Sequence, residues 1–293
     1  MASPRELRRR IKSISSTSQI TRAMQMVASS KMRKAQQATL MTRPAVKLLY
    51  RIQRRAVTHA HDFTDPLLEV REVRKRAVIL VGTDKGLCGA LNTNLFRVAQ
   101  QFDPATTAFI AVGKRAAQFV ARTRRQLVAE FTCADSPRFG EARAIANFAR
   151  DLFVKHEVDE VRVAATRFIN TLSQQAVAVE FLPIGEIKAG ASLKIPGVES
   201  EAELAADTSE YIFEPSPETV LSFLFGNYLN IFIYFVLLDA KASEQSARMV
   251  AMKNATDNAE RLIKDLTLQY NKLRQGNITK ELLEIAGGQL GND

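Results

Sequence analysis

Both ends of the chain are long stretches that contain few of the residues that break helices. No glycine occurs in the first 81 residues, and no proline follows Pro217. Serine–proline pairs at 3–4 and 216–217 are typical of helix starts, because serine caps the first turn and proline fits its first position. We therefore expect helices over about 4–58 and 217–286, roughly 80 and 105 Å long. Since a small domain is only about 30 Å across, each helix must lie against another helix or a partner.

The two helices share the alternating three- and four-residue spacing of a coiled coil. In the first helix this spacing selects Leu7, Ile11, Ile14, Ser18, Thr21, Ala28, Met32 and Ala35. In the second helix it selects Ala255, Ala259, Leu262, Leu266, Gln269, Leu273 and Gly276. Many of these side chains are small or polar, so the helices can approach closely but form a weak zipper. We predict an antiparallel coiled coil of the two ends, with the middle of the chain inserted.

The middle of the chain alternates between strand-like and helix-like segments. The runs that favour strands occupy 77–81, 108–112, 127–131, 158–165 and 176–181. The helical patterns open near Asn92 or Asn94 and then occupy 114–121 and 141–155. This alternation predicts an α/β sheet with helices on its faces. Residues 189–210, with glycines and a run of acidic side chains, are expected to form a linker.

The positive charge of the chain is concentrated at its N-terminal end. The net charge is +10, yet residues 1–76 alone hold 18 Lys and Arg against 5 Asp and Glu. A basic arm allows the hypothesis of a nucleic-acid-binding coiled coil. Against stacking on single strands, Tyr50 is the only aromatic residue before position 63. The Arg- and Ser-rich first 35 residues also resemble a mitochondrial transit peptide, but the helical pattern continues past residue 50 without a break.

Residues 219–238 carry no charged side chain, and twenty such residues are long enough to span a bilayer. Polar residues lie near the middle of this run, where they are costly in a membrane; they are Ser222, Asn227 and Asn230. The flanks also lack the basic anchor that is usual beside a span. We therefore favour a helix that is buried against protein over a transmembrane helix.

The glycine-bearing loop after the first strand, residues 82–89, raises the question of nucleotide binding. Only the Gly86-x-x-Gly89 spacing matches a dinucleotide motif, the lysine precedes Gly86, and Asp84 would repel an anion. We interpret the loop as a structural turn between strand and helix, and a nucleotide-binding enzyme remains the weaker alternative.

Other sites with a chemical role are not indicated by the sequence. The three histidines, His59, His61 and His156, form no metal-binding motif, and Cys88 and Cys133 form no CxxC pair. We expect no catalytic residue, no cofactor and no metal.

Four segments resemble the gamma subunit of bacterial-type F-type ATP synthases. They are Ile20–Met32 (ITRAMQMVASSKM), Thr83–Asn92 (TDKGLCGALN), Ala242–Ala259 (ASEQSARMVAMKNATDNA) and Leu266–Ile285 (LTLQYNKLRQGNITKELLEI). The resemblance covers residues 6–288 in the expected order. It implies a long antiparallel coiled coil of the N- and C-terminal helices with an inserted Rossmann-like α/β domain. The expected parts are a first helix over 1–65, the α/β domain over 74–188, the linker over 189–210 and the last helix over 211–293.

The resemblance also implies a function and a set of partners. Such subunits form the central rotor stalk, which enters a ring of alpha and beta subunits and whose foot meets the epsilon subunit and the c-ring. Rotation of the stalk couples proton flow to ATP synthesis or hydrolysis, and the stalk itself does no bond chemistry. The expectation is one copy per complex, peripheral to the membrane on the cytoplasmic face of a bacterial cell, with no nucleic-acid partner.

Six positions match residues of the family that contact the surrounding ring. They are Met24, Arg248, Arg274, Gln275, Thr279 and Glu281. The resemblance places the first two near the lever region of the beta subunits. It assigns the third and fourth to a pair that catches a beta-subunit loop, and the last two to the tip of the C-terminal helix.

Overall fold

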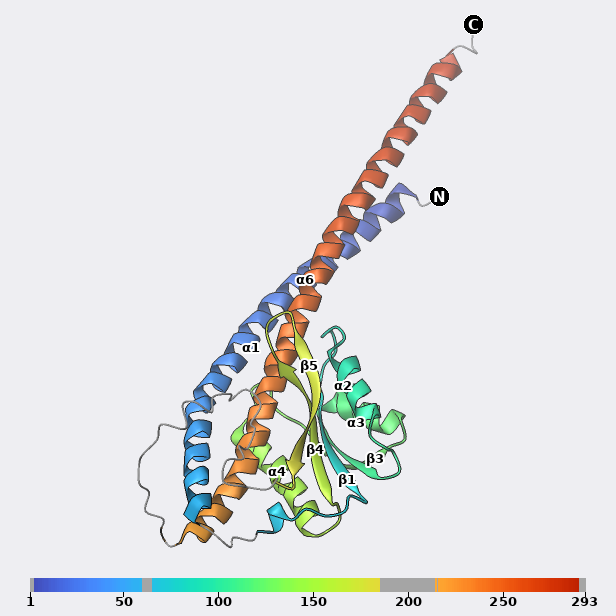
Figure 1. Cartoon of the computed structure of the whole chain (residues 1–293). Helices are drawn as coiled ribbons and strands as arrows, with labels where there is room; N and C mark the ends of the chain where they lie inside the picture. The colour runs from blue at the N-terminus through green and yellow to red at the C-terminus, as the bar shows by residue number, and fades with distance from the viewer. Residues whose placement is uncertain (1–2, 60–64, 185–213, 215, 290–293) are drawn as a thin grey trace. The chain divides into compact units, whose positions relative to one another are not determined.

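A computed structural model of the chain describes residues 3–59, 65–184, 214 and 216–289. Its elements are α1 (Pro4–His59), η1 (Pro66–Leu68), β1 (Arg76–Val81), α2 (Leu91–Gln100), β2 (Thr107–Val112), α3 (Lys114–Arg122), β3 (Gln126–Phe131), α4 (Phe139–Val154), β4 (Glu160–Phe168), β5 (Gln174–Leu182) and α6 (Pro217–Gln289) (Figure 1). The two long helices and all five predicted strands are confirmed. The predicted linker over 189–210 lies outside the described residues.

Contacts divide the chain into two units, and the division cuts across both long helices. Met1–Ser29 and Arg248–Asp293 form one, called here the two-helix unit. Ser30–Ala247 form the other, called here the α/β unit. Each long helix therefore takes part in two different packing environments along its length.

Both long helices begin at the serine caps that the sequence predicts. The hydroxyl of Ser3 accepts a hydrogen bond from the backbone N–H of Glu6 at 3.3 Å, and that of Ser216 accepts one from Thr219 at 3.3 Å. Each bond satisfies one of the first N–H groups of its helix, which have no partner within the helix. Pro44 lies inside α1, and the helix continues past it.

The sheet of the α/β unit has the strand order β3-β2-β1-β4-β5. The first four strands are parallel, whereas β5 pairs with β4 in the antiparallel sense. β1 lies in the middle and is buried from Ala77 to Val81, with Ala77 opposite both Ala108 and Val161. This position explains its uninterrupted apolar sequence, because strands that are covered on both faces need no polar alternation.

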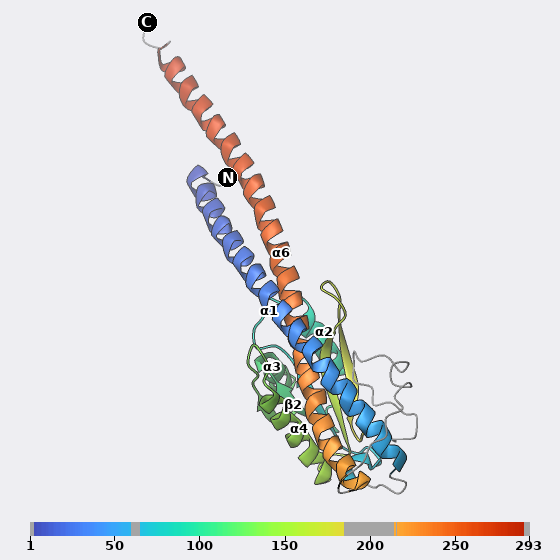
Figure 2. The ribbon, with the colours of Figure 1, turned by 90° about the vertical axis from the view of Figure 1, so that its left-hand side faces the viewer.

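Helices cover both faces of the sheet. α2 and α3 pack on the face that carries Val78, Leu80 and Phe109, and the rings of Phe96 and Phe119 stack there at 4.3 Å. α4 and the first part of α6 pack on the opposite face (Figures 1 and 2). Three layers of this kind, with a parallel sheet in the middle, give the Rossmann-like arrangement that the resemblance implies.

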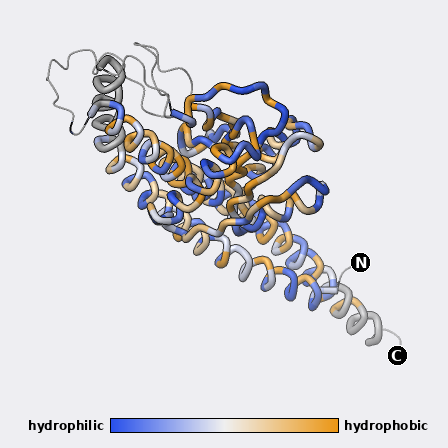
Figure 3. Tube along the Cα trace, turned by 90° about the horizontal axis from the view of Figure 1, so that it is seen from below, coloured by the Kyte–Doolittle hydropathy of each residue, from blue (hydrophilic) through white to orange (hydrophobic). Residues whose placement is uncertain are grey.

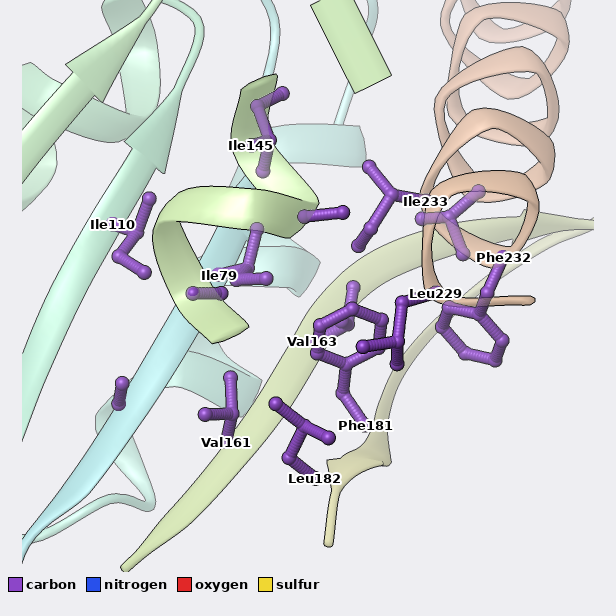
Figure 4. Close-up of a cluster of buried hydrophobic side chains, with 14 of the residues drawn as sticks. Ile79, Ile110, Ile145, Val161, Val163, Phe181, Leu182, Leu229, Phe232 and Ile233 are labelled. Carbon is purple, nitrogen blue, oxygen red and sulfur yellow. The ribbon is translucent and has the colours of Figure 1, made fainter. Parts of the chain in front are cut away.

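The uncharged run 219–238 forms part of the core of the α/β unit. Among the described residues, one helix, within Glu218–Thr279, is long and apolar enough to cross a membrane. However, its side chains Leu229, Phe232 and Ile233 face Val163 and the neighbouring core of the sheet (Figure 4). In Figure 3, which colours the trace by hydropathy, the hydrophobic colour is most frequent in the middle of the picture, where the elements overlap. The interpretation of a helix buried against protein is therefore confirmed.

The loop over 82–89 is shaped by close packing. A Cβ atom on Gly82 would lie 3.0 Å from the Cβ of Ala116, and Gly113 adopts a positive φ of 91° with its Cβ position 2.9 Å from the carbonyl oxygen of Gly82. Asp84 Oδ1 accepts a hydrogen bond from the backbone N–H of Lys114 at 3.0 Å, so its carboxylate caps α3. These contacts confirm the structural role that we assigned to the loop.

Candidate functional site

The helices of the two-helix unit run antiparallel and meet along a narrow seam (Figures 1 and 2). The predicted N-terminal seam is confirmed, with Leu7, Ser18 and Ala28 buried. The hydroxyls of Thr21 and Thr256 lie 2.7 Å apart across it. Small side chains at these positions allow the close approach of the two helices that the spacing predicted.

The predicted seam of the second helix is wrong at every other position. Leu262 is 51% exposed and Gln269 is exposed, whereas Ile263 and Tyr270 are partly buried in their place. The less exposed series is Met252, Thr256, Ala259, Ile263, Leu266, Tyr270 and Leu273. Ala259, Leu266 and Leu273 belong to both series, and the adjacent apolar pair at 262 and 263 fits either. The sequence therefore left the phase of the seam open between these shared positions.

Charged side chains flank the seam. Arg22 Nη2 lies 2.8 Å from Glu260 Oε1, and both side chains are about half exposed, at 64% and 47%. An ion pair in such contact with water contributes little to stability. It instead favours one pairing of the helices, since a shift along the axis would separate the charges.

Two of the candidate residues lie at the end of the two-helix unit where its α6 part begins, at Arg248, and they differ in exposure. Met24 is partly buried, and Arg248 is 8% exposed and engaged in further interactions. Counted from the Thr21–Thr256 contact, Met24 lies opposite position 253, which is roughly 7 Å along the axis from Arg248 at 1.5 Å per residue. The structure thus brings these two candidates into the same part of the unit.

The other candidates lie at the far end of α6. Arg274, Gln275 and Thr279 are exposed, and the Thr279 hydroxyl donates a hydrogen bond to the carbonyl of Gln275 at 2.9 Å. The side chain of Glu281 lies outside the described residues. By the same counting, Arg274 lies opposite Ser3, so α6 continues beyond the start of α1, as Figures 1 and 2 show.

The part of α6 beyond the start of α1 exposes large apolar side chains, namely Ile278, Leu282 and Leu283. Leu282 is 61% exposed. Further apolar side chains point to solvent along the paired part of the unit, and they are Ile20, Met26, Val27, Leu262 and Leu268. These exposed apolar side chains lie on both helices of the two-helix unit and are accessible from solvent in the single chain.

Reasoning from the sequence missed a group of buried polar side chains on α6 within the α/β unit. Lys241, Ser243, Glu244, Gln245 and Ser246 are all buried. The Ser243 hydroxyl donates to the carbonyl of Thr166 at 3.2 Å, and the Ser246 hydroxyl donates to that of Thr171 at 2.7 Å. The signal in the sequence was a run of polar residues directly after the apolar run 219–238, on the same helix.

Lys241 and its partners form a charged cluster at this place. Its Nζ lies 3.1 Å from Glu244 Oε2 and 4.0 Å from Asp84 Oδ2, the carboxylate that also caps α3. A cavity of about 20 Å³ beside the cluster is lined by Thr166 and Cys133 among others, and it has room for about one water molecule. Burial raises the pKa of the Cys133 thiol to about 11, which keeps it protonated and unreactive near neutral pH.

Within the α/β unit, an ion pair also joins the second part of α1 to the loop between β3 and α4. Lys31 Nζ lies 2.6 Å from Asp135 Oδ2, and this hydrogen bond holds the pKa of the Asp135 carboxyl below its usual range. Among the described residues, no group of three or more His, Cys, Asp or Glu side chains could hold a metal ion. The polar groups of the unit thus join its elements to one another.

The chain resembles known proteins over nearly its whole length. The family model described as ATP synthase matches residues 3–290. The ATP synthase gamma chain of Opitutus terrae is 45% identical over 290 residues, which cover 99% of this chain and 98% of that one. The gamma chain of Methylacidiphilum infernorum is 41% identical, with 99% of each chain covered. The chain belongs to the ATP synthase gamma chain family.

Solved structures show the same fold for this gamma chain family member. A chain of the mitochondrial ATP synthase of Euglena gracilis, in an assembly of OSCP, F1 and c-ring, matches with a TM-score of 0.66 at 19% identity, over 98% of this chain and 94% of that one. A chain of the central stalk and c-ring of the Tetrahymena thermophila enzyme matches with a TM-score of 0.58 at 23% identity, over 80% of this chain and 99% of that one.

Proposed function

We propose that the chain is the central rotor stalk subunit of an F-type ATP synthase, which couples proton flow to ATP synthesis or hydrolysis by rotation. The observation that carries this proposal is the 45% identity over 290 residues to an ATP synthase gamma chain, together with the ATP synthase family model that matches residues 3–290. The two-helix unit supports it, because a thin seam with outward-facing apolar side chains suits an axle inside a ring of other subunits. Rotation then acts through contacts that differ between the states of that ring.

The partners follow from the same proposal. The alpha and beta subunits would surround the two-helix unit, and the epsilon subunit and the c-ring would contact the α/β unit. One copy would serve each complex, without a nucleic-acid partner, and the complex would be peripheral to the cytoplasmic face of a bacterial membrane. The chain would do no bond chemistry, in keeping with a sequence that carries no catalytic or metal-binding motif.

The six matched positions would contact the ring. Exposure supports this role for Arg274, Gln275 and Thr279, because side chains that point to solvent in the single chain are free to meet another subunit. Met24 and Arg248 are less exposed, so we assign them to positioning the seam near such contacts. For Glu281 the assignment rests on the resemblance alone.

Reconstitution with the cognate alpha and beta subunits tests the proposal. The full chain should copurify with them, and ATP should drive rotation of a bead held on the α/β unit. A variant truncated after Leu273 should lose ATP-driven proton pumping in the complete enzyme. A full-length chain that stayed monomeric beside folded alpha and beta subunits would overturn the proposal.

The roles of the exposed pair are tested separately in the assembled enzyme. Arg274→Ala with Gln275→Ala should lower the number of protons pumped per ATP hydrolysed. Lys264→Ala, an exposed charge on the same helix, is the matched control and should leave this ratio unchanged. Equal ratios in the pair variant and the wild type would remove these two residues from the contact.

A further inference from the structure

We propose that five polar side chains of α6, called here the polar joint, fix the axial and rotational register of the helix against the sheet. Lys241, Ser243, Glu244 and Ser246 are buried, and Asp239 is half-buried. This register of α6 would be a property of the single chain and would not need other subunits. Its consequence for torque rests on the proposed function, because only a rotor needs its foot and its shaft to turn without slippage. The argument begins from the packing on either side of the joint.

The apolar core beneath the joint holds α6 but does not by itself select one register. Leu229, Phe232 and Ile233 are buried against the sheet, and their stabilisation depends on the area removed from water. Hydrophobic burial is non-directional. An apolar helix face that is displaced by one turn along its axis can therefore bury a similar area. A displacement of one turn, about 5.4 Å, is a known mode of change between packed elements.

The polar joint adds bonds that a displaced helix could not make. Asp239 Oδ2 accepts from the backbone N–H of Phe168 at 3.0 Å, at the end of β4. Ser243 and Ser246 donate to the carbonyls of Thr166 and Thr171 at 3.2 and 2.7 Å. All three bonds reach β4 and the turn after it, and each needs its partner within hydrogen-bond distance.

Lys241 ties the helix to a second place on the sheet. Its Nζ lies 4.0 Å from Asp84 Oδ2 in the loop after β1, while Glu244 Oε2 lies 3.1 Å away on the same helix. Asp84 is held in turn by its bond to the N–H of Lys114. The joint therefore grips α6 from β4 on one side and from the β1 loop on the other.

The cost of leaving these groups without partners makes the joint selective. A buried polar group that loses its hydrogen bond is destabilising, and a buried charge without its partner is more so. A one-turn slip of α6 would break every bond between the joint and the rest of the α/β unit while keeping much of the apolar contact; the Lys241–Glu244 pair, which lies within the helix, would remain. The polar groups therefore penalise the wrong registers more than they stabilise the right one.

Distance measurement in the full chain tests the register directly. Spin labels at Gln118→Cys on α3 and Phe223→Cys on α6 occupy exposed positions within the α/β unit, and the native Cys88 is buried and Cys133 is hard to ionise. With the joint intact we expect one narrow distance. In an Asp239→Ala background, with Ser243→Ala, Ser246→Ala, Lys241→Met and Glu244→Gln added as the fourfold variant, we expect a second population displaced by about 5 Å, one helical turn.

Controls separate loss of register from loss of the fold. Lys253→Met, an exposed lysine on the same helix, should keep the single distance. The serine pair and the Lys241–Glu244 pair, changed separately, should each broaden the distribution, so the proposal stays testable if the fourfold variant does not fold. A folded variant that lacks these groups and retains one narrow distance would overturn the proposal.

The complete enzyme provides the second readout. With a bead on the α/β unit, the spread of dwell angles during ATP-driven rotation should rise about twofold in the fourfold variant, as two registers of shaft and foot coexist. If the wild-type chain fails to assemble or rotate, the proposed function fails and the distance result stands alone. If rotation is normal in a variant whose distances have split, the joint does not transmit torque.

Discussion

The same helix, α6, is held by opposite kinds of chemistry in the two units. In the α/β unit it buries large side chains such as Phe225 and Leu229, together with the polar joint. In the two-helix unit many of its neighbours across the seam are small or polar, as Ala28 and Thr21 show. Hydrophobic stabilisation scales with the apolar area that is buried. The packing of α6 therefore contributes much stability in the α/β unit and little in the two-helix unit. The difference teaches that a helix can be anchored at one place and left available to partners at another.

The largest expected effect on stability tests the packing of α6 in the core of the α/β unit. Phe225→Ala should lower the free energy of unfolding of the full chain by about 3–5 kcal/mol, because it opens a cavity in the core. Phe223→Ala, two residues away and 71% exposed, should cost less than about 0.5 kcal/mol. Chemical denaturation of the two variants measures both values, and similar costs would contradict the placement of this helix face.

The seam of the two-helix unit should be destabilised by a larger side chain. Ala28 is 1% exposed at the seam, so Ala28→Leu should force the helices apart and cost about 1–3 kcal/mol. Ala23→Leu makes the same change at an exposed position of α1 and should be close to neutral. Thermal unfolding followed by circular dichroism distinguishes them. A seam that accepts leucine at position 28 without cost would not be closely packed there.

The contact between the two threonines should be smaller in effect. Thr21→Val and Thr256→Val should each cost about 1 kcal/mol, and the double variant should cost less than their sum. A double-mutant cycle in the full chain measures this coupling. Additive costs would mean that the two hydroxyls, 2.7 Å apart, act independently.

The smallest effect belongs to the exposed ion pair. A cycle of Arg22→Gln and Glu260→Gln should give a coupling below about 0.5 kcal/mol that decreases further in high salt. Denaturation at low and high ionic strength is the measurement. A large coupling that salt does not change would show that the pair is shielded from water and that the seam is broader than described.

The positions of the elements along the chain could be predicted from the sequence, because their signals are local, whereas the strand order and the antiparallel β5 were not predicted. The capping serines Ser3 and Ser216 each indicate the start of a helix. The apolar run at 77–81 indicates a strand without reference to any other segment. The phase of the C-terminal seam could not be predicted, since Leu262 and Ile263 offer an apolar side chain to either alternative. Only the partner helix decides which of the two it contacts.

Only part of the candidate site could be predicted from the sequence. The positions at the end of α6 came from resemblance, and their exposure agrees with contacts to another subunit. The polar joint was not foreseen, because hydrophobic periodicity assigns lysine and glutamate to a solvated face. Lys241 is 8% exposed, and its buried charge is compensated by Glu244 at 3.1 Å and by Asp84, far away in the sequence, at 4.0 Å. A pairing over such a sequence distance leaves no local pattern.

The cap that Asp84 places on α3 has a further consequence. The N-terminus of a helix after a strand of a Rossmann-like sheet attracts phosphate, through its free N–H groups and the helix dipole. Here the carboxylate of Asp84 already accepts a hydrogen bond from the N–H of Lys114, so it occupies one of the N–H groups that a phosphate would need. The start of α3 is thus neutralised from within the chain, and a side chain takes the place that an anion would otherwise occupy at that N–H group.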